Sequence, residues 1–365
     1  MLRLKFAGIL ILVFLFSQSE AQRHVIKIPD IPGYKTLKGD FHMHTVFSDG
    51  TVWPTVRVQE AWEEGLDVIS ITEHIEYRPH SSDMNADHNR AYEIAEPLAN
   101  KLDLILVRGA EITRSMPPGH LNALFIKNAN LLELEDVNDA LQEARAQGAF
   151  LMWNHPGWKA QQPDTTLWWD EHSELLKKDL LHGIEVYNEE FTPEALLWAN
   201  EKKLTMFGNS DIHGPANYGD GHRPMTLIFS KSRTLGGIKE ALFSKRTAVY
   251  FDNIIVGNAS FLNPLFFASL QIDKKPVNLK NEESKIIYIE NTSDLDYQLE
   301  LAQPGVGFDA PENLNLKSGQ ITAVELTGNS IEVGQMQNLK IYYEVKNLKL
   351  SNTDNLVVTI TLQNI

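Results

Sequence analysis

Between residues 35 and 253, short apolar runs alternate with longer segments in which apolar and polar positions follow a helical period. The apolar, β-prone runs predict strands at Leu66–Thr72, Leu104–Val107, Ala149–Trp153, Gly183–Tyr187, Leu204–Phe207 and Met225–Phe229. The intervening segments predict helices at Thr55–Glu64, His88–Leu102, Leu134–Gln147 and Leu235–Ser244. Such alternation is typical of parallel β/α units, and about seven units favour a closed barrel over an open sheet. No glycine-rich phosphate loop follows a predicted strand, which also disfavours the open sheet.

Beyond Leu262 the chain changes to short β-prone runs that are separated by Asn, Ser, Asp and Gly rather than by helices. These runs are Lys285–Glu290, Tyr297–Leu301, Ile321–Leu326, Leu339–Val345 and Leu356–Leu362. Strands at this spacing predict a small antiparallel β-sandwich. Because this region contains no histidine, we expect it to supply no metal ligands and to have a structural or docking role.

The first 21 residues differ from both regions. Arg3 and Lys5 give a basic start, Phe6–Phe16 is an apolar run, and Ser19 and Ala21 are small residues spaced for cleavage. This pattern is typical of a secretory signal peptide, since the run is too short to span a bilayer comfortably; an uncleaved anchor is the alternative. We therefore predict a signal peptide at 1–21, a barrel at 22–260 and a sandwich at 261–365 in a secreted, periplasmic bacterial protein.

Composition narrows the function further. The 365-residue chain has a formal net charge of −15, which repels nucleic acid at long range, and no large basic patch offsets this charge. The chain has no cysteine, so disulfides, thiolate metal ligands and a lipoprotein anchor are excluded. No other stretch is apolar enough to be a transmembrane helix. We expect a small-molecule substrate, no nucleic acid polymer and no integral membrane association after signal cleavage; the oligomeric state is not indicated.

Residues that can bind metal ions gather in short clusters, most of which directly follow a predicted strand. They comprise six of the 12 histidines and three acidic residues: His42, His44, Asp49, His74, Glu111, His120, His155, Asp211 and His213. A single histidine is more often structural, but so many at the ends of barrel strands indicate a catalytic mouth. Imidazoles and carboxylates without thiolates suit Zn, Mn or Fe at a hydrolytic centre.

These clusters resemble the four motifs of the PHP (polymerase and histidinol phosphatase) domain over residues 36–255. The matching positions are His42-Met43-His44, Asp49, Glu73-His74, Glu111, His120, Asn154-His155-Pro156 and Asp211-Ile212-His213. The resemblance implies a distorted (β/α)7 barrel with a trinuclear metal site that hydrolyses phosphate esters. The segments Glu111–Arg114, Pro118–Ala123 and Trp153–Trp158 are similar to secreted bacterial PHP phosphodiesterases.

The resemblance also implies a role for each ligand. The first metal would be held by His42, His44, Glu111 and Asp211, the second by Glu111 as a bridge with His120 and His155, and the third by Asp49, His74 and His213. Three divalent ions, of Mn, Zn or Fe, would hydrolyse small phosphate diesters by in-line attack of a metal-bridging hydroxide. Glu111 and Asp211 would thus be central to catalysis.

Several residues near the motifs are candidates for substrate binding or acid catalysis. Arg114 is the best candidate to guide phosphate, because guanidinium matches phosphate bidentately, and Arg78 and Arg223 are further candidates. His80 and His222 could protonate a leaving oxygen. For these side chains, surface salt bridges and exposed loops are the competing interpretation.

The aromatic and acidic residues next to the motifs could each have either of two roles. Trp158 could wall the substrate pocket, whereas core packing is the default for Trp153. Glu73 is expected to orient an imidazole, and it could replace His74 as a ligand; on a strand end the two point opposite ways, and we prefer His74.

Three other functions remain open. A phosphomonoesterase of the histidinol-phosphate or nucleotide type would use the same metals. An amidohydrolase also begins with His-x-His, but it commonly bridges two metals with a modified lysine, and no lysine ends the run Ala149–Trp153 or Gly183–Tyr187. A metal-dependent binding protein is the third, although none of the ligand positions has been lost.

Overall fold

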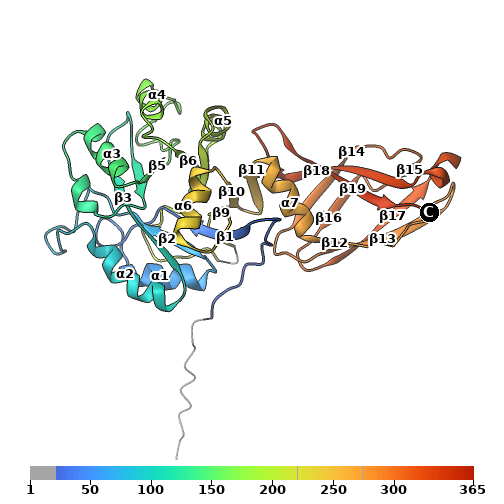
Figure 1. Ribbon diagram of the computed structural model, residues 1–365, viewed down its shortest axis with the longest axis horizontal. Coiled ribbons are helices and arrows are strands. Elements are labelled where there is room, and N and C mark those ends of the chain that lie inside the picture. The colour runs from blue at the N-terminus through green and yellow to red at the C-terminus, as the bar shows by residue number, and fades with distance from the viewer. Residues whose placement is uncertain (1–21, 220, 274) are drawn as a thin grey trace, which may run out of the picture.

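The computed structural model describes residues 22–219, 221–273 and 275–365. The predicted signal peptide therefore lies outside the described residues. Figure 1 shows two parts side by side along the long axis of the molecule: an α/β part, drawn in blue to yellow, and a part built mainly of strands, drawn in orange to red.

The α/β part contains both strands and helices in alternation. Its strands are β1 (Lys35–Asp40), β2 (Val68–Ile71), β3 (Ile105–Ile112), β4 (Leu121–Leu124), β5 (Phe150–Trp153), β6 (Gly183–Asn188), β7 (Glu190–Phe191), β8 (Thr205–Asn209), β9 (Met225–Ser230), β10 (Thr247–Phe251) and β11 (Ile254–Gly257). Its helices are α1 (Pro54–Glu63), α2 (Arg90–Lys101), the 3-10 helix η1 (Ala129–Leu132), α3 (Val137–Ala146), α4 (Asp170–Lys177), α5 (Pro193–Lys202) and α6 (Leu235–Phe243). Helix α7 (Ala259–Ala268) follows at the junction with the second part (Figure 1).

The strands of this part form a distorted barrel. Parallel pairs join β1 to β2 and β2 to β3, and further parallel pairs join β5 to β6 and β6 to β8. Between β8 and β9, side-chain hydrogen bonds take the place of backbone pairing. The Thr226 hydroxyl accepts from the Gly208 N–H at 3.1 Å and donates to the Gly208 carbonyl at 3.0 Å. The Thr247 hydroxyl donates to the Met206 carbonyl at 2.8 Å. The expected α/β barrel is confirmed.

The sheet is less regular than the sequence pattern predicts. Strand β4 lies antiparallel between β3 and β5, and β9 is antiparallel to both β1 and β10. A parallel crossover needs a dozen or more residues, whereas only residues 113–120 separate β3 from β4. The short connection therefore forces an antiparallel strand, and the segment 121–124 was not predicted as a strand.

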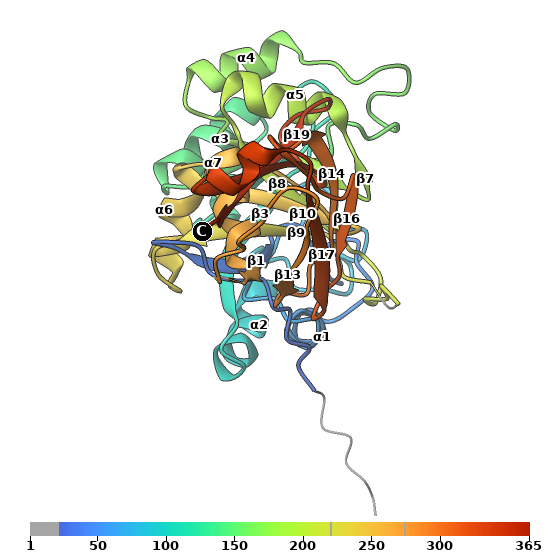
Figure 2. The same ribbon diagram turned by 90° about the vertical axis from the view of Figure 1, so that its right-hand side faces the viewer.

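Helices cover the barrel on two opposite sides. Helices α1 and α2 lie on one side, and α3, α4 and α5 lie on the other, both in Figure 1 and in the perpendicular view of Figure 2. Helix α3 illustrates the local cause: the Asp136 side chain accepts hydrogen bonds from the N–H groups of Asn138 and Asp139, and Leu141 is buried. Every residue of β5 is buried, as expected for a strand covered on both faces.

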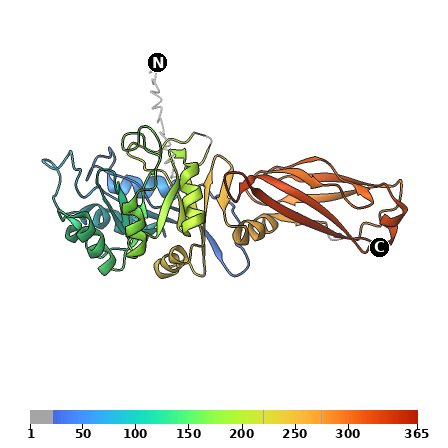
Figure 3. The same ribbon diagram turned by 90° about the horizontal axis from the view of Figure 1, so that it is seen from above.

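The second part is an antiparallel sandwich, as expected. Its elements are β12 (Leu270–Ile272), β13 (Ser284–Asn291), β14 (Tyr297–Gln303), β15 (Phe308–Asp309), β16 (Asn313–Leu316), β17 (Ile321–Gly328), the 3-10 helix η2 (Ile331–Gln335), β18 (Asn338–Lys349) and β19 (Asn355–Gln363). One sheet has the order β12-β13-β17-β15, and the other contains β16, β14, β18 and β19. Figure 3 shows its strands running along the long axis of the molecule.

The two parts share a sheet. Strand β11 pairs in parallel with β18, with Ile255 opposite Leu348 and Val256 opposite Lys349. One buried apolar cluster also extends across the junction, from Phe229 of the barrel to Tyr343 of the sandwich. Over the described residues, none of the helices has the length and apolar character that crossing a membrane requires.

Candidate metal centre

The nine predicted metal ligands meet at one end of the barrel. They come from the segments that follow or end the strands: His42, His44 and Asp49 after β1, His74 after β2, Glu111 in β3, His120 directly before β4, His155 after β5, and Asp211 and His213 after β8. Because the carboxyl ends of parallel strands meet at one edge, residues distant in sequence become neighbours there. The structure thus brings together all nine positions that the motifs indicated.

Two carboxylates organise the centre. The Asp211 Oδ1 atom lies 3.1 Å from His42 Nε2 and 3.0 Å from His44 Nε2. The Glu111 carboxylate lies 2.7 Å from His74 Nδ1 and 3.0 Å from His120 Nδ1. These spacings allow small ions to be shared between the acidic and imidazole groups.

The ligand atoms form four overlapping groups, each with its atoms within 4.8 Å of one another. The groups are His42–His44–Asp211, His42–Glu111–His155, His74–Glu111–His120 and His44–Asp49–His74–His213. Glu111 belongs to two groups, which is the geometry that a bridging ligand needs. The grouping differs from the expected ligand sets mainly because His42, His44 and His74 are each shared as well.

Buried polar atoms that make no hydrogen bond indicate a site that can bind metal ions. Among the described residues, four buried atoms make no hydrogen bond although they lie close to other ligand atoms: His42 Nε2, His44 Nε2, Glu111 Oε2 and Asp211 Oδ1. An unsatisfied buried polar atom costs roughly 1–3 kcal/mol, so several in one place need a common explanation. Divalent metal ions fit both these atoms and the donor types, which are imidazole nitrogen and carboxylate oxygen.

The charges also suit metal ions. Burial alone would raise the pKa of Glu111, but the Coulombic attraction of His74 and His42 holds it well below its ordinary value. Burial lowers the pKa of His44 to about 4, so this imidazole is neutral and can donate a lone pair. The nearby carboxylates Glu111 and Asp49 raise the pKa of His74 to about 10 despite its burial. Metal ions must therefore displace a proton from His74, which links their affinity to pH.

Glu185 in β6 was not among the predicted site residues, yet it is a main support of the centre. Its fully buried carboxylate lies 2.8 Å from His42 Nδ1 and accepts a hydrogen bond of 2.7 Å from the His155 N–H. It also accepts from the side chains of Asn188 at 2.7 Å and Asn209 at 2.8 Å. Glu185 thus fixes the ring of one predicted ligand and the backbone of another. A lone acidic residue in the apolar run of β6 was the available signal.

Arg57 of α1 is a second support that sequence reasoning missed. Its fully buried guanidinium donates to the carbonyl of His44 at 2.9 Å and to the carbonyl of Ile212 at 3.1 Å. It therefore ties together the segments after β1 and β8, which carry five of the predicted ligands. An arginine on an amphipathic helix has no sequence signature for this role.

Glu73 faces away from the ligand cluster, whereas His74 faces into it. The Glu73 carboxylate accepts hydrogen bonds from the hydroxyls of Thr45 and Ser48. Ser48 Oγ in turn lies 3.3 Å from His44 Nδ1. Glu73 therefore acts on an imidazole through Ser48 rather than directly, which is close to the expected orienting role.

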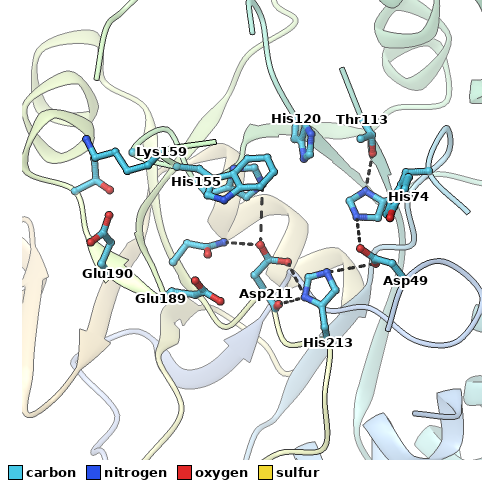
Figure 4. A pocket seen from close by; sticks show the side chains of 15 residues that line it. Asp49, His74, Thr113, His120, His155, Lys159, Glu189, Glu190, Asp211 and His213 are labelled. Carbon is cyan, nitrogen blue, oxygen red and sulfur yellow. Dashed lines mark hydrogen bonds and ion pairs between the residues drawn. The ribbon is translucent and has the colours of Figure 1, made fainter. Parts of the chain in front are cut away.

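A cavity of about 840 Å³ opens over the centre. Figure 4 shows its walls, with Asp49 in direct contact with both His74 and His213. The Trp158 ring, which is 45% exposed, forms part of the wall and lies 5.2 Å from the ring of His155. The expected position of Trp158 in the pocket wall therefore agrees with the geometry.

Comparison with solved structures identifies the family. The chain is similar to the crystal structure of a two-domain protein from Bacteroides vulgatus ATCC 8482 that contains a predicted PHP-like metal-dependent phosphoesterase. The two are 44% identical, the match covers 93% of this chain and 99% of that one, and the TM-score is 0.87. The chain belongs to the PHP-like metal-dependent phosphoesterases. This membership accounts for the metal-binding geometry of the barrel.

Other comparisons bear on parts of the chain. A family model described as an Ig-like domain matches residues 270–361, in agreement with the observed sandwich. A protein of Bifidobacterium adolescentis ATCC 15703, described as a candidate metal-dependent phosphoesterase, is 19% identical with a TM-score of 0.39, and the match covers 50% of this chain and 89% of that one. That similarity is too low to bear on function. No curated protein matches the chain.

The arginines expected to guide the phosphate of this phosphoesterase lie elsewhere. Arg114 pairs with Glu76 at 2.8 Å and donates to the Leu134 carbonyl, and Arg78 donates to the carbonyls of two residues of its own loop. Arg223 is fully buried between Asp40 and Glu64. In the described structure none of these arginines lines the cavity, because each guanidinium is held by partners outside it.

The two loop histidines of the phosphoesterase lie in different surroundings. His80 is exposed, and it does not line a cavity near the centre in the described structure. His222 lies nearer: it lines a second cavity that adjoins the centre, and its ring is 5.3 Å from that of His24. Burial lowers the pKa of His222, so it is neutral near pH 7.

Proposed function

We propose that this phosphoesterase hydrolyses small phosphate diesters and uses three divalent metal ions bound by the nine clustered side chains. The observation that carries the proposal is the convergence of these side chains, with several buried atoms lacking hydrogen-bond partners, beneath a cavity of about 840 Å³. The similarity to a two-domain protein with a PHP-like phosphoesterase supports the chemistry.

The ligand assignment follows the motifs and the observed proximities. We assign His42, His44 and Asp211 to one ion, His120 and His155 to a second, and Asp49, His74 and His213 to a third, with Glu111 as the bridge between the first two. When bound, such ions would polarise the phosphoryl oxygens, lower the pKa of the attacking water and offset the charge that develops.

The residues of the chain have their own tasks in this proposal. Asn154 donates a hydrogen bond of 2.8 Å to Glu111 Oε1, which keeps the bridging carboxylate oriented. Glu185 holds the His42 ring through Nδ1, and so leaves Nε2 free to face the centre. Trp158 and the neighbouring histidine rings exclude water from one side of the cavity.

We further propose that the protein is exported by a signal peptide at residues 1–21 and acts in the periplasm on small molecules rather than on nucleic acid. The acidic net charge of −15 supports the small substrate. Sequencing the N-terminus of protein from a periplasmic fraction tests export; a chain that keeps its first residues in the cytoplasm would contradict it.

The activity is tested with two chromogenic esters. Protein lacking residues 1–21 is supplemented with Mn²⁺ and assayed with bis(p-nitrophenyl) phosphate and with p-nitrophenyl phosphate, with and without EDTA. Faster, EDTA-sensitive turnover of the diester is expected. Turnover of the monoester alone would instead identify a phosphomonoesterase, and inactivity on both would contradict the proposal. Metal analysis should give about three ions per chain.

A further inference from the structure

A second cavity adjoins the candidate metal centre. It measures about 460 Å³ and shares three wall residues, Glu189, Asp211 and His213, with the larger cavity described above. The other residues that line the smaller cavity do not line the larger one. The segment that carries Asp211 and His213 therefore borders both cavities, and these two predicted ligands belong to both walls.

Two cavities at one phosphate site suit a particular substrate. A phosphate monoester has one organic group and needs one cavity, whereas a diester has two organic groups that leave the tetrahedral phosphorus in different directions. We propose that a diester binds with its phosphate at the centre and one organic group in each cavity, and that the smaller cavity takes a small cationic group. This inference rests on the proposed function and specifies its substrate.

The larger cavity suits a group with a flat face. The exposed Trp158 ring stands beside the predicted ligands His120 and His155, and Tyr77 lines the same cavity. Aromatic side chains of this kind bind planar or apolar groups by stacking on them and by burying apolar surface area. At the outer end, Lys159 and Glu190 give the rim a mixed charge (Figure 4).

The smaller cavity suits a cationic group. Tyr187 and Tyr218 line it, and so do the exposed carboxylates Glu189 and Asp252. Aromatic faces attract ammonium groups through their quadrupole, and nearby carboxylates add a favourable Coulombic energy. A second phosphate or a carboxylate on this group would be repelled. The chemistry therefore favours a small alkylammonium.

Buried charges hold the wall of the smaller cavity in place. The Arg223 guanidinium lies 5.6 Å from the centre of the Tyr218 ring. Arg223 is fixed by Asp40 Oδ2 at 3.0 Å and by Glu64, and all of its side chain is buried. Arg223, which the sequence suggested as a phosphate ligand, is thus a positioning residue for an aromatic wall.

A substrate series with a constant leaving group tests the proposal. In each case the oxygen of water forms a bond to phosphorus, the bond to p-nitrophenolate breaks, and the proton of water is released to solvent. The series is p-nitrophenyl phosphate, p-nitrophenyl phosphorylcholine and its uncharged isostere, the 3,3-dimethylbutyl ester. We expect the Mn-supplemented protein to prefer the choline ester to the isostere by at least fivefold in kcat/KM, and equal rates would overturn the cationic assignment.

A steric block tests the second cavity itself. A Cβ atom added at Gly214, in its wall, meets no other atom within 4 Å, so we expect the side chain of Gly214→Leu to occupy part of the cavity. We expect kcat/KM for the choline ester to fall at least tenfold, while the monoester rate stays within twofold. Gly236→Leu is the matched control, because Gly236 also has open space but lies in α6, away from both cavities.

A binding measurement guards against indirect effects of a change next to His213. Calorimetric titration should show that Gly214→Leu weakens phosphorylcholine at least tenfold and leaves inorganic phosphate and metal content unchanged. Asn217→Trp, which fills the same cavity from an exposed position, should act in the same way. If both variants cleave and bind the choline compounds normally, the inference fails although the proposed function stands. If the unaltered protein cleaves no ester, it is the proposed function that fails.

Discussion

At the scale of single residues, the candidate centre depends on side chains that orient the ligands as much as on the ligands themselves. Glu185 contacts His42, the His155 backbone and two asparagines with one buried carboxylate. An ionised carboxylate next to Nδ1 keeps a ligating imidazole aligned and more basic. Such a group has no motif of its own, so only the fold reveals it.

We predict that Glu185→Gln weakens metal binding. The amide keeps the size of the side chain but loses the charge that supports the His42 ring, and changes of this kind cost roughly 10–100-fold in metal affinity. Competition with a chelator, followed by metal analysis of the protein, measures the loss. Glu171→Gln is the control, because Glu171 is an exposed acidic residue of α4. Equal metal affinity in both variants would refute the role of Glu185.

His172 links stability to pH outside the ligand set. Its Nδ1 accepts a hydrogen bond of 3.2 Å from the Trp169 N–H, its Nε2 donates to the Pro118 carbonyl at 2.8 Å, and its ring stacks on Trp153 at 3.7 Å. Burial lowers the pKa of His172 to about 4 from an ordinary value of 6.5. Protonation would also break the hydrogen bond that Nδ1 accepts.

The direction of the pH effect follows from which state binds the proton first. The unfolded state protonates His172 as the pH falls below 6.5, whereas the folded state resists until about pH 4, so the free energy of unfolding decreases through this window. The shift corresponds to a loss of roughly 3 kcal/mol. Urea unfolding in EDTA, compared between the unaltered protein and His172→Gln, should show a stability difference that shrinks with acid. A difference independent of pH would contradict the prediction.

The nine ligand positions could be predicted from the sequence because histidine and acidic residues recur at fixed places relative to the apolar runs. The substrate-binding residues could not be predicted, because the side chain of an arginine near a motif can point either into the site or away from it. Arg223 is buried by Asp40 and Glu64, two carboxylates whose positions depend on distant parts of the chain. Sequence spacing therefore predicts metal ligands, which are held by strand ends, better than it predicts the walls of a pocket.

At the scale of secondary-structure elements, the tight turn after β1 sets the position of Asp49. Its backbone bonds run from the N–H groups of Ser48 and Gly50 to the Thr45 carbonyl, at 3.1 and 2.9 Å. A Cβ atom at Gly50 would lie 2.7 Å from both the His44 carbonyl carbon and the Thr45 nitrogen. Because these neighbours are backbone atoms, the turn must move to accommodate any side chain.

We predict that Gly50→Ala lowers metal occupancy by about one ion per chain, since the displaced turn carries Asp49 away from His74 and His213. Metal analysis after dialysis measures the occupancy. Gly236→Ala is the control: its Cβ meets open space in helix α6, so we expect full occupancy and a gain in stability of up to about 1 kcal/mol. Full occupancy in Gly50→Ala would show that the turn is more compliant than this packing indicates.

The type of an element, helix or strand, could be predicted where the apolar positions follow a single period. The direction of a strand within the sheet could not. The run that became β5 is apolar throughout and was predicted as a strand, and the structure shows every residue of it buried. Strand β4 has only four residues, and its direction is set by the short connection after β3 and by pairing with β5. Information of that kind lies in the assembled sheet rather than in local sequence.

At the scale of the whole molecule, barrel and sandwich form one continuous structure. The β11–β18 pair continues the barrel sheet into the sandwich, and the apolar cluster at the junction contains residues of both parts. Unfolding one part alone would expose the edge of β11 together with this apolar surface, which is costly in water. We therefore expect a single calorimetric unfolding transition for the full chain, and two well-separated transitions would contradict this coupling.

Asn347 offers a direct test of that coupling. Its side-chain amide donates to the Asn253 carbonyl of the barrel at 2.8 Å and to the Asp296 carbonyl of the sandwich at 2.7 Å, and it accepts from the Gln298 N–H at 3.2 Å. Asn347→Ala leaves three backbone groups without this partner at a buried position, which should cost roughly 1–3 kcal/mol.

A loss of this size in the free energy of unfolding should lower the melting temperature by several degrees. The metal content should stay normal, because Asn347 lies at the junction between the two parts and is not one of the predicted ligands. Calorimetry and metal analysis of the same sample measure both quantities. Asn329→Ala is the matched control, since the side chain of this exposed residue donates to Asp309 within the sandwich and does not contact the barrel in the described structure. If Asn347→Ala instead splits the transition in two, the amide is what makes the parts unfold together. An unchanged melting temperature would mean that the shared sheet alone holds them.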